Sequence, residues 1–189
     1  MPKQQNGNFL KQLITISFLA TLSCVMIACA HTPKVKISRT DITFEEPNRM
    51  RFHGKGAGAG MMMMSSMGPM GIAIGVAIDE GIGKEIGEAA NKADFDLASL
   101  LVAGLAGAAQ QIESIHVKRY GFVTRRGEND PVAPQLHLEI QTANGVKEIK
   151  YPEAFDDAKI TTHPLEQLKA QGATAIKAFE NAIQVIAQQ

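Results

Sequence analysis

The sequence predicts an α+β protein with a small antiparallel sheet, a C-terminal amphipathic helix and a glycine-rich helical hairpin inserted between strands. Three observations predict this class. Several short segments alternate apolar and polar residues, which indicates half-buried strands. The C-terminal residues repeat their apolar positions at helical spacing. In the middle of the chain, small residues recur every four positions, which is typical of closely packed helices.

The composition excludes several classes of protein. The 19 Lys and Arg residues only balance 19 Asp and Glu residues, whereas a nucleic-acid binder needs a clustered excess of cations. The two cysteines, Cys24 and Cys29, cannot supply a disulfide framework or an all-cysteine zinc site. Neither a G-x-S-x-G nor an H-E-x-x-H motif occurs. We therefore predict no enzymatic activity and no cofactor.

The N-terminal segment has the features of a secretory signal. Lys3 and Lys11 precede an uncharged run of 18 residues from Leu13 to Ala30. The last part of this run, Met26–Cys29, resembles a bacterial lipobox, whose cysteine receives a lipid and becomes the first residue after cleavage. We expect residues 1–28 to be removed as a lipoprotein signal peptide and Cys29 to carry the lipid.

Two alternatives stay open for this segment. Cys24 is a second candidate for lipidation, although Thr21 is polar where the lipobox pattern has an apolar residue. The other alternative is an uncleaved N-terminal helix that crosses the membrane once, because 18 apolar residues are near the lower limit for a span. In lipoproteins of this kind, an Asp after the lipidated Cys favours the inner membrane. Ala30 in this place implies the outer membrane.

Residues 29–53 form a linker followed by one or two strands. Val35, Ile37, Ile42 and Phe44 alternate with polar residues, and residues 49–53 form a second short strand. From Gly54 to Gly60 every second residue is Gly, which predicts a flexible linker, and we expect residues 54–70 to be mobile.

Residues 54–112 contain the predicted helical hairpin, and 23 consecutive residues within it, from 56 to 78, have no charge. Its first helix follows Pro69. One face of that helix carries a stripe of helix-packing glycines, which are Gly71, Gly75, Gly83 and Gly87. We expect this stripe to pack against a second helix over residues 95–112, capped by Asp94 or Asp96.

Residues 113–189 provide the remaining strands and the C-terminal helix. We predict strands over residues 115–122, with a bulge near Gly121, over residues 136–140, and over residues 147–151. The turn Asn144-Gly145 joins the last two as a hairpin. The amphipathic helix follows His163-Pro164 and is interrupted at Gly172. We expect residues 29–189 to form one domain.

Six of the nine methionines lie between residues 61 and 70, and Met64, Met67 and Met70 have an M-x-x-M-x-x-M spacing. Thioethers suit Cu(I), and His53 is near in sequence, so a periplasmic copper-binding module is an alternative function. Adjacent methionines after a glycine-rich segment are more typical of a deformable apolar surface, and we therefore predict no metal site.

Five charged or titratable residues are candidates for a structural role. His116 and His137 both project from polar strand faces and would meet if their strands paired, although we expect solvated side chains. Asp79 interrupts the glycine stripe and needs a partner if it is buried. Lys84, one turn after Glu80, is placed to pair with it.

Together, the lipobox and the glycine stripe resemble bacterial glycine-zipper lipoproteins of the outer membrane, over residues 1–30 and roughly 54–110. The resemblance implies a lipid-anchored, non-enzymatic protein of the cell envelope with a structural or interaction role, facing the periplasm or the cell surface. Its implied partners are the lipid membrane, through Cys29, and a second copy or an envelope protein, through the Gly/Met-rich segment. No nucleic acid is among them.

Overall fold

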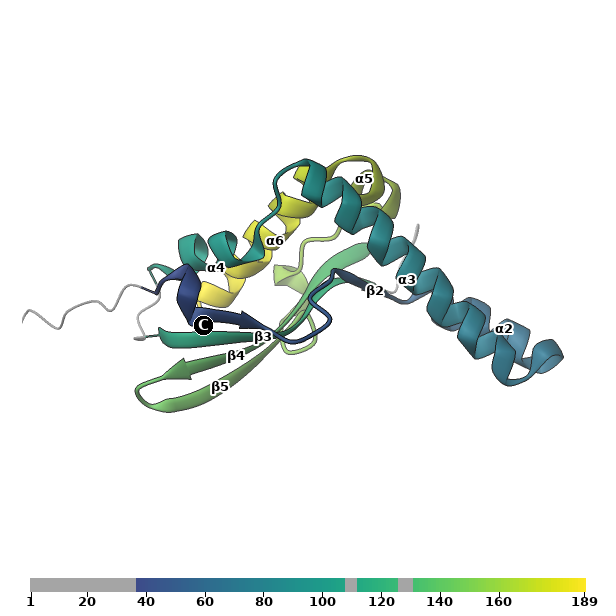
Figure 1. Cartoon of the computed structure of the whole chain (residues 1–189), viewed down its shortest axis with the longest axis horizontal. Helices are drawn as coiled ribbons and strands as arrows, with labels where there is room; N and C mark the ends of the chain where they lie inside the picture. The colour runs from purple at the N-terminus through teal and green to yellow at the C-terminus, as the bar shows by residue number, and fades with distance from the viewer. Residues whose placement is uncertain (1–36, 108–111, 126–130) are drawn as a thin grey trace, which may run out of the picture. The chain divides into compact units, whose positions relative to one another are not determined.

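The computed structural model describes residues 37–107, 112–125 and 131–189. The contacts of the chain divide it into residues 1–34 and residues 35–189, and every described residue belongs to the second part. The predicted signal segment, Cys24, Cys29 and Val35 therefore lie outside the described residues. The described part has an α+β fold with a C-terminal helix, which confirms the predicted fold class (Figure 1).

The described strands form one mixed sheet. β3 (Ile112–Thr124), β4 (Val132–Thr142) and β5 (Gly145–Tyr151) are antiparallel neighbours, and β4 and β5 form the predicted hairpin. The turn itself is Ala143-Asn144, one residue earlier than predicted, because Gly145 already pairs with Thr142. β1 (Ile42–Phe44) and β2 (Arg51–His53) both pair with β3 in the parallel direction. Parallel pairing needs a long crossover, and the helices between β2 and β3 provide it.

Two local features explain why the strands differ from the predicted ones. Residues Arg39–Asp41 form a short 3-10 helix because Ser38 and Asp41 make a reciprocal capping box. Of the first predicted strand, therefore, only the part that forms β1 is a strand in the structure. The pairing of β3 with β4 shifts register between Ile112 and Ser114 and again between Val117 and Arg119, but not at Gly121. Gly121 has a φ of +153°, and a Cβ there would lie 1.8 Å from the Arg51 carbonyl oxygen. The absence of a side chain at Gly121 therefore lets β2 lie against β3. The shift between Val117 and Arg119, in contrast, changes which face of the sheet the following residues of β3 occupy.

The helices cover one face of the sheet. α4 (Leu97–Leu105) and α6 (Gly172–Ala187) lie across it, and the shorter α5 (Leu165–Ala170) precedes α6 (Figure 1). Phe122 on β3 and Phe179 on α6 are fully buried, with ring centroids 5.1 Å apart. Burial of large aromatic and aliphatic side chains between these layers provides most of the stabilisation of such a fold.

The predicted hairpin is present, but its two helices are not the expected ones. α2 (Lys55–Met67) and α3 (Pro69–Lys92) pack side by side, so the expectation of a mobile segment over residues 54–70 was wrong. The predicted second helix is the short α4, which packs on α6, and Ile112 belongs to β3. Glycine weakens an isolated helix, but tertiary contact between two glycine-rich helices overrides this weakness.

The C-terminal helix is interrupted at Gln171, whose backbone is extended, and α6 begins with Gly172 for a reason that lies elsewhere in the chain. A Cβ at this position would be 2.0 Å from the carbonyl oxygen of Ala89 on α3. The first turn of α6 therefore touches the α3 backbone directly, and only glycine fits between them.

Candidate functional site

The glycine stripe of α3 contacts two different elements. A Cβ at Gly71 would lie 2.6 Å from the Met64 backbone nitrogen, and one at Gly75 would lie 2.3 Å from the Gly56 carbonyl oxygen, both on α2. A Cβ at Gly83 would lie 3.0 Å from the Met50 carbonyl oxygen, beside β2. Gly71 and Gly75 thus bring two helix backbones together, while Gly83 brings α3 against a strand.

Gly87, the last residue of the stripe, is less constrained. Its nearest neighbour is the Met50 Cβ, 3.6 Å from where a Cβ of residue 87 would lie, which is an ordinary van der Waals distance. The stripe does not have α4 as its partner, because α4 packs on α6.

Asp79 of α3 caps the N-terminus of α2. Its Oδ1 accepts a hydrogen bond from the Gly56 N–H at 2.6 Å, and its Oδ2 accepts one from the Gly54 N–H at 3.1 Å. The first N–H groups of a helix have no partner within the helix, and the N-cap residue, Gly54, has no side chain to bind them. The carboxylate also interacts favourably with the positive end of the helix dipole. Sequence reasoning found Asp79 but not this role.

The neighbouring charges pair differently from the prediction. The Arg49 guanidinium, between β1 and β2, donates to Glu80 Oε1 at 2.6 Å. Lys84 lies 3.9 Å from Glu88, one turn further along α3, so the expected pairing of Lys84 with Glu80 does not occur. Arg49 reaches Glu80 because Gly83 allows the segment before β2 to lie close to α3.

A groove of about 890 Å³ lies between residues 48–53 and α3, and Phe95 and Tyr120 also line it. His53 lines it, and the Nε2 atom of this side chain is buried without a hydrogen-bond partner among the described residues. Burial is the main cause that lowers the pKa of His53. The imidazole is therefore held in its neutral form at neutral pH. The charged side chains Glu80 and Asp79 at this groove are already engaged, as described above.

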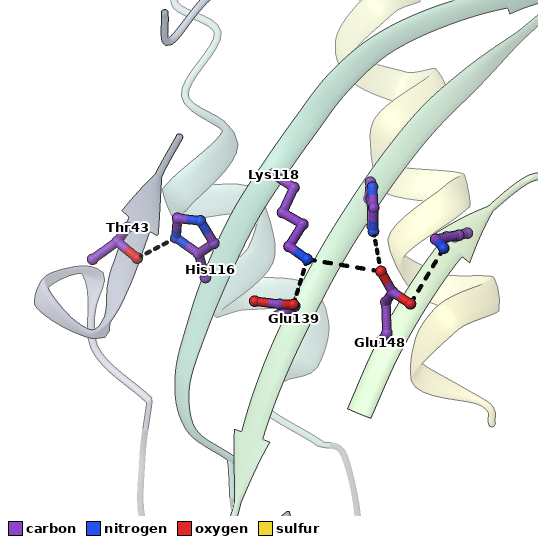
Figure 2. Close-up of polar contacts among 7 residues, drawn as sticks. Thr43, His116, Lys118, Glu139 and Glu148 are labelled. Carbon is purple, nitrogen blue, oxygen red and sulfur yellow. Dashed lines mark hydrogen bonds and ion pairs between the residues drawn. The ribbon is translucent and has the colours of Figure 1, made fainter. Parts of the chain in front are cut away.

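The outer face of the sheet carries a second polar cluster (Figure 2). The Lys118 ammonium contacts Glu139 and lies 3.8 Å from Glu148. Glu148 also accepts from His137 at 2.6 Å and pairs with Lys150 at 3.2 Å. Figure 2 shows Lys118 between the two carboxylates, which come from β4 and β5.

The two predicted histidines do not meet in this cluster. The bulge in β3 places His116 opposite Glu139 and His137 opposite Arg119. His116 Nδ1 lies 3.0 Å from the Thr43 hydroxyl, and His137 contacts Glu148. Hydrogen bonds from His137 and Lys150 lower the pKa of Glu148, and the hydrogen bond to Glu139 raises the pKa of Lys118. This cluster is a surface network of paired charges and contains no unpaired acid and base aimed at a common point.

The methionines lie at the far end of the α2–α3 hairpin. Met61 and Met62 are 74% and 80% exposed, and Met64, Met67 and Met70 are also exposed. His53 precedes the opposite end of α2, about 16 Å from the level of Met64 at the rise of a helix, so it does not join them. Within the described ranges, no group of three His, Cys, Asp or Glu side chains could hold a metal ion.

Among the described helices, none combines the length and the hydropathy that a membrane span requires. No family model matches the chain, no curated protein matches it, and no solved structure matches it.

Proposed function

We propose that this protein is a non-enzymatic, lipid-anchored protein of the bacterial cell envelope with a structural or interaction role. The sequence around Cys29 supports the anchor, and Ala30 supports the outer membrane as its location, with the folded part facing the periplasm. The described polar clusters support a non-enzymatic role, because their carboxylates and ammonium groups neutralise each other.

The observation that carries the interaction role is the position of the exposed apolar side chains. Eight large hydrophobic residues are exposed in the described part of the chain, and seven of them lie on α2 and the first half of α3. They are Met61, Met62, Met64, Met67, Met70, Ile72 and Val76. Such a concentration is typical of a surface that contacts another molecule or a membrane.

The anchor is tested with two matched cysteine variants of the full chain, Cys29→Ser and Cys24→Ser. We expect the Cys29→Ser variant to accumulate as the unprocessed precursor and to be absent from the outer-membrane fraction. The Cys24→Ser variant should be processed and retained normally, and mass spectrometry should find a lipid on residue 29. Normal processing of the Cys29→Ser variant would move the lipid to Cys24, whereas membrane retention of both variants without cleavage would support an uncleaved helix.

A further inference from the structure

The charge-free part of the α2–α3 hairpin has a sharp lower boundary, which we call the hairpin base. Lys55 begins α2, and Asp79 lies 24 residues later in the sequence (79 minus 55), on α3. The hydrogen bond from Gly56 to Asp79 places both residues at the same level of the hairpin. Every residue beyond this level, from 56 to 78, is uncharged, and Figure 1 shows these turns extending beyond the sheet.

The length of this part matches one leaflet of a bilayer. Residues 56–67 of α2 extend about 18 Å from the base, and residues 69–78 of α3 extend about 15 Å, at 1.5 Å per residue. A hydrocarbon core of about 30 Å gives each leaflet about 15 Å. The hairpin therefore has the length to enter one leaflet from its own side.

The exposed apolar residues lie on both helices of the hairpin, with Ile72 and Val76 on α3 and the others chiefly on α2. Met61, Met62 and Met64 span an arc of about 160° around the α2 axis. All three are exposed, while Gly56 and Gly60 face α3. A protein partner would cover one side of the hairpin, whereas a lipid phase surrounds it on every outward side.

Two hydroxyls and the Gly68 and Gly71 N–H groups at the tip of the hairpin bind within the hairpin. The Ser65 hydroxyl donates to the Met62 carbonyl at 2.8 Å, and the Ser66 hydroxyl donates to the Met63 carbonyl at 3.2 Å. The Gly68 N–H donates to the Met64 carbonyl at 3.0 Å, and Pro69, the first residue of α3, has no N–H to satisfy. Internal satisfaction of backbone and hydroxyl groups is what entry into hydrocarbon requires.

We propose that the α2–α3 hairpin inserts, up to the hairpin base, into one leaflet of a phospholipid bilayer without crossing it. This inference rests on the proposed anchoring, because the lipid on Cys29 holds the folded part near the membrane surface. The hairpin then fixes the height of the domain, with Asp79 and Glu80 at the level of the headgroups. Its partner is the acyl chain region of the leaflet, not a second protein.

The test uses the full lipidated protein in vesicles of phosphatidylethanolamine and phosphatidylglycerol. A nitroxide is attached to a cysteine in the variant Met70→Cys or in the matched control Val146→Cys, whose native residues are 63% and 65% exposed. The collision rates of each label with oxygen and with a water-soluble nickel chelate are then compared. We expect the ratio of oxygen to nickel collisions to be several-fold higher at position 70 than at position 146. Adding Met62→Lys to Met70→Cys should reduce this difference.

Two results would overturn the insertion. Equal ratios at positions 70 and 146 would show that the hairpin stays in water. Spin–spin broadening at position 70, with low access to both reagents, would show that a second copy covers it. Failure of the proposed anchoring has a different result. A protein without lipid on Cys29 would bind a second nitroxide at the free thiol, and its mass would lack that of the lipid.

Discussion

The carboxylate of Asp79 on α3 accepts the Gly56 N–H of α2 at 2.6 Å, so one helix of the hairpin caps the other. The two residues are 23 positions apart in the sequence. Capping and helix packing are thereby coupled: α2 has a satisfied N-terminus only when α3 lies beside it. Several measurable consequences depend on this coupling.

Removal of the cap should destabilise the protein more than removal of the adjacent charge. We expect Asp79→Ala to lower the free energy of unfolding by about 1 to 2 kcal/mol, because two backbone donors lose their acceptor. The control is Glu80→Ala, which removes only the exposed pair with Arg49 and should cost under about 1 kcal/mol. Chemical denaturation measures both, and equal losses would contradict the cap.

The close approach of α2 and α3 predicts opposite effects of one substitution at two glycines of α3. Gly75→Ala should destabilise by about 1 to 3 kcal/mol, because its Cβ would lie 2.3 Å from the Gly56 carbonyl oxygen. Gly81 has no atom within 4 Å of its Cβ position. Gly81→Ala should therefore stabilise by up to about 1 kcal/mol through helix propensity. Thermal unfolding of the two variants tests this, and destabilisation by both would refute it.

Stability should fall when the pH drops through the ordinary titration range of histidine. Burial lowers the pKa of both His53 and His163 below 6.5. Below about pH 6.5, the unfolded chain therefore binds more protons than the folded chain. The free energy of unfolding is then lost from about pH 6.5 downwards. We expect the free energy of unfolding of the double variant His53→Gln, His163→Gln to change much less across pH 6.5 than that of the native protein. Chemical denaturation at pH values on both sides of 6.5 measures this difference. An unchanged slope would mean that other groups cause it.

The methionines should not bind copper tightly. Equilibrium dialysis with Cu(I) should show no stoichiometric uptake by the native protein, because the exposed Met61 and Met62 do not enclose a common site. The control is the triple variant Met64→Leu, Met67→Leu, Met70→Leu, which keeps the apolar volume and should behave identically. Stoichiometric binding by the native protein that is lost in this variant would support a copper-binding module.

Local patterns in the sequence were sufficient for the C-terminal half of the fold. The alternation of Leu136, Leu138 and Ile140 and the hairpin signal Asn144-Gly145 depend on neighbouring residues. The structure confirms the strands and the hairpin, with its turn one residue earlier than predicted. The α6 helix also follows from its own apolar spacing. These elements carry their structural signal within about ten residues.

The glycine-rich segment was harder to predict because its structure depends on distant contacts. Residues 54–60 have low helix propensity, and nothing near them in sequence indicates that Gly56 touches Gly75. The parallel pairing of Phe52 with Phe122 is equally non-local. The role of Asp79 as a cap could be found only once the two helices were placed side by side. The lipidation sites, Cys29 and Cys24, stay predictions from the sequence.

Gly83 has a consequence for how the protein behaves at high concentration. By holding α3 against the backbone of β2, it shields the β2 part of one margin of the sheet from strand addition by another chain. The opposite margin is β5, where Lys147, Glu148 and Lys150 place charges on the exposed strand and disfavour pairing. The proposed lipid anchor would concentrate the protein in two dimensions, where it would meet its own copies often. We expect these two devices to limit polymerisation through the sheet on such a surface.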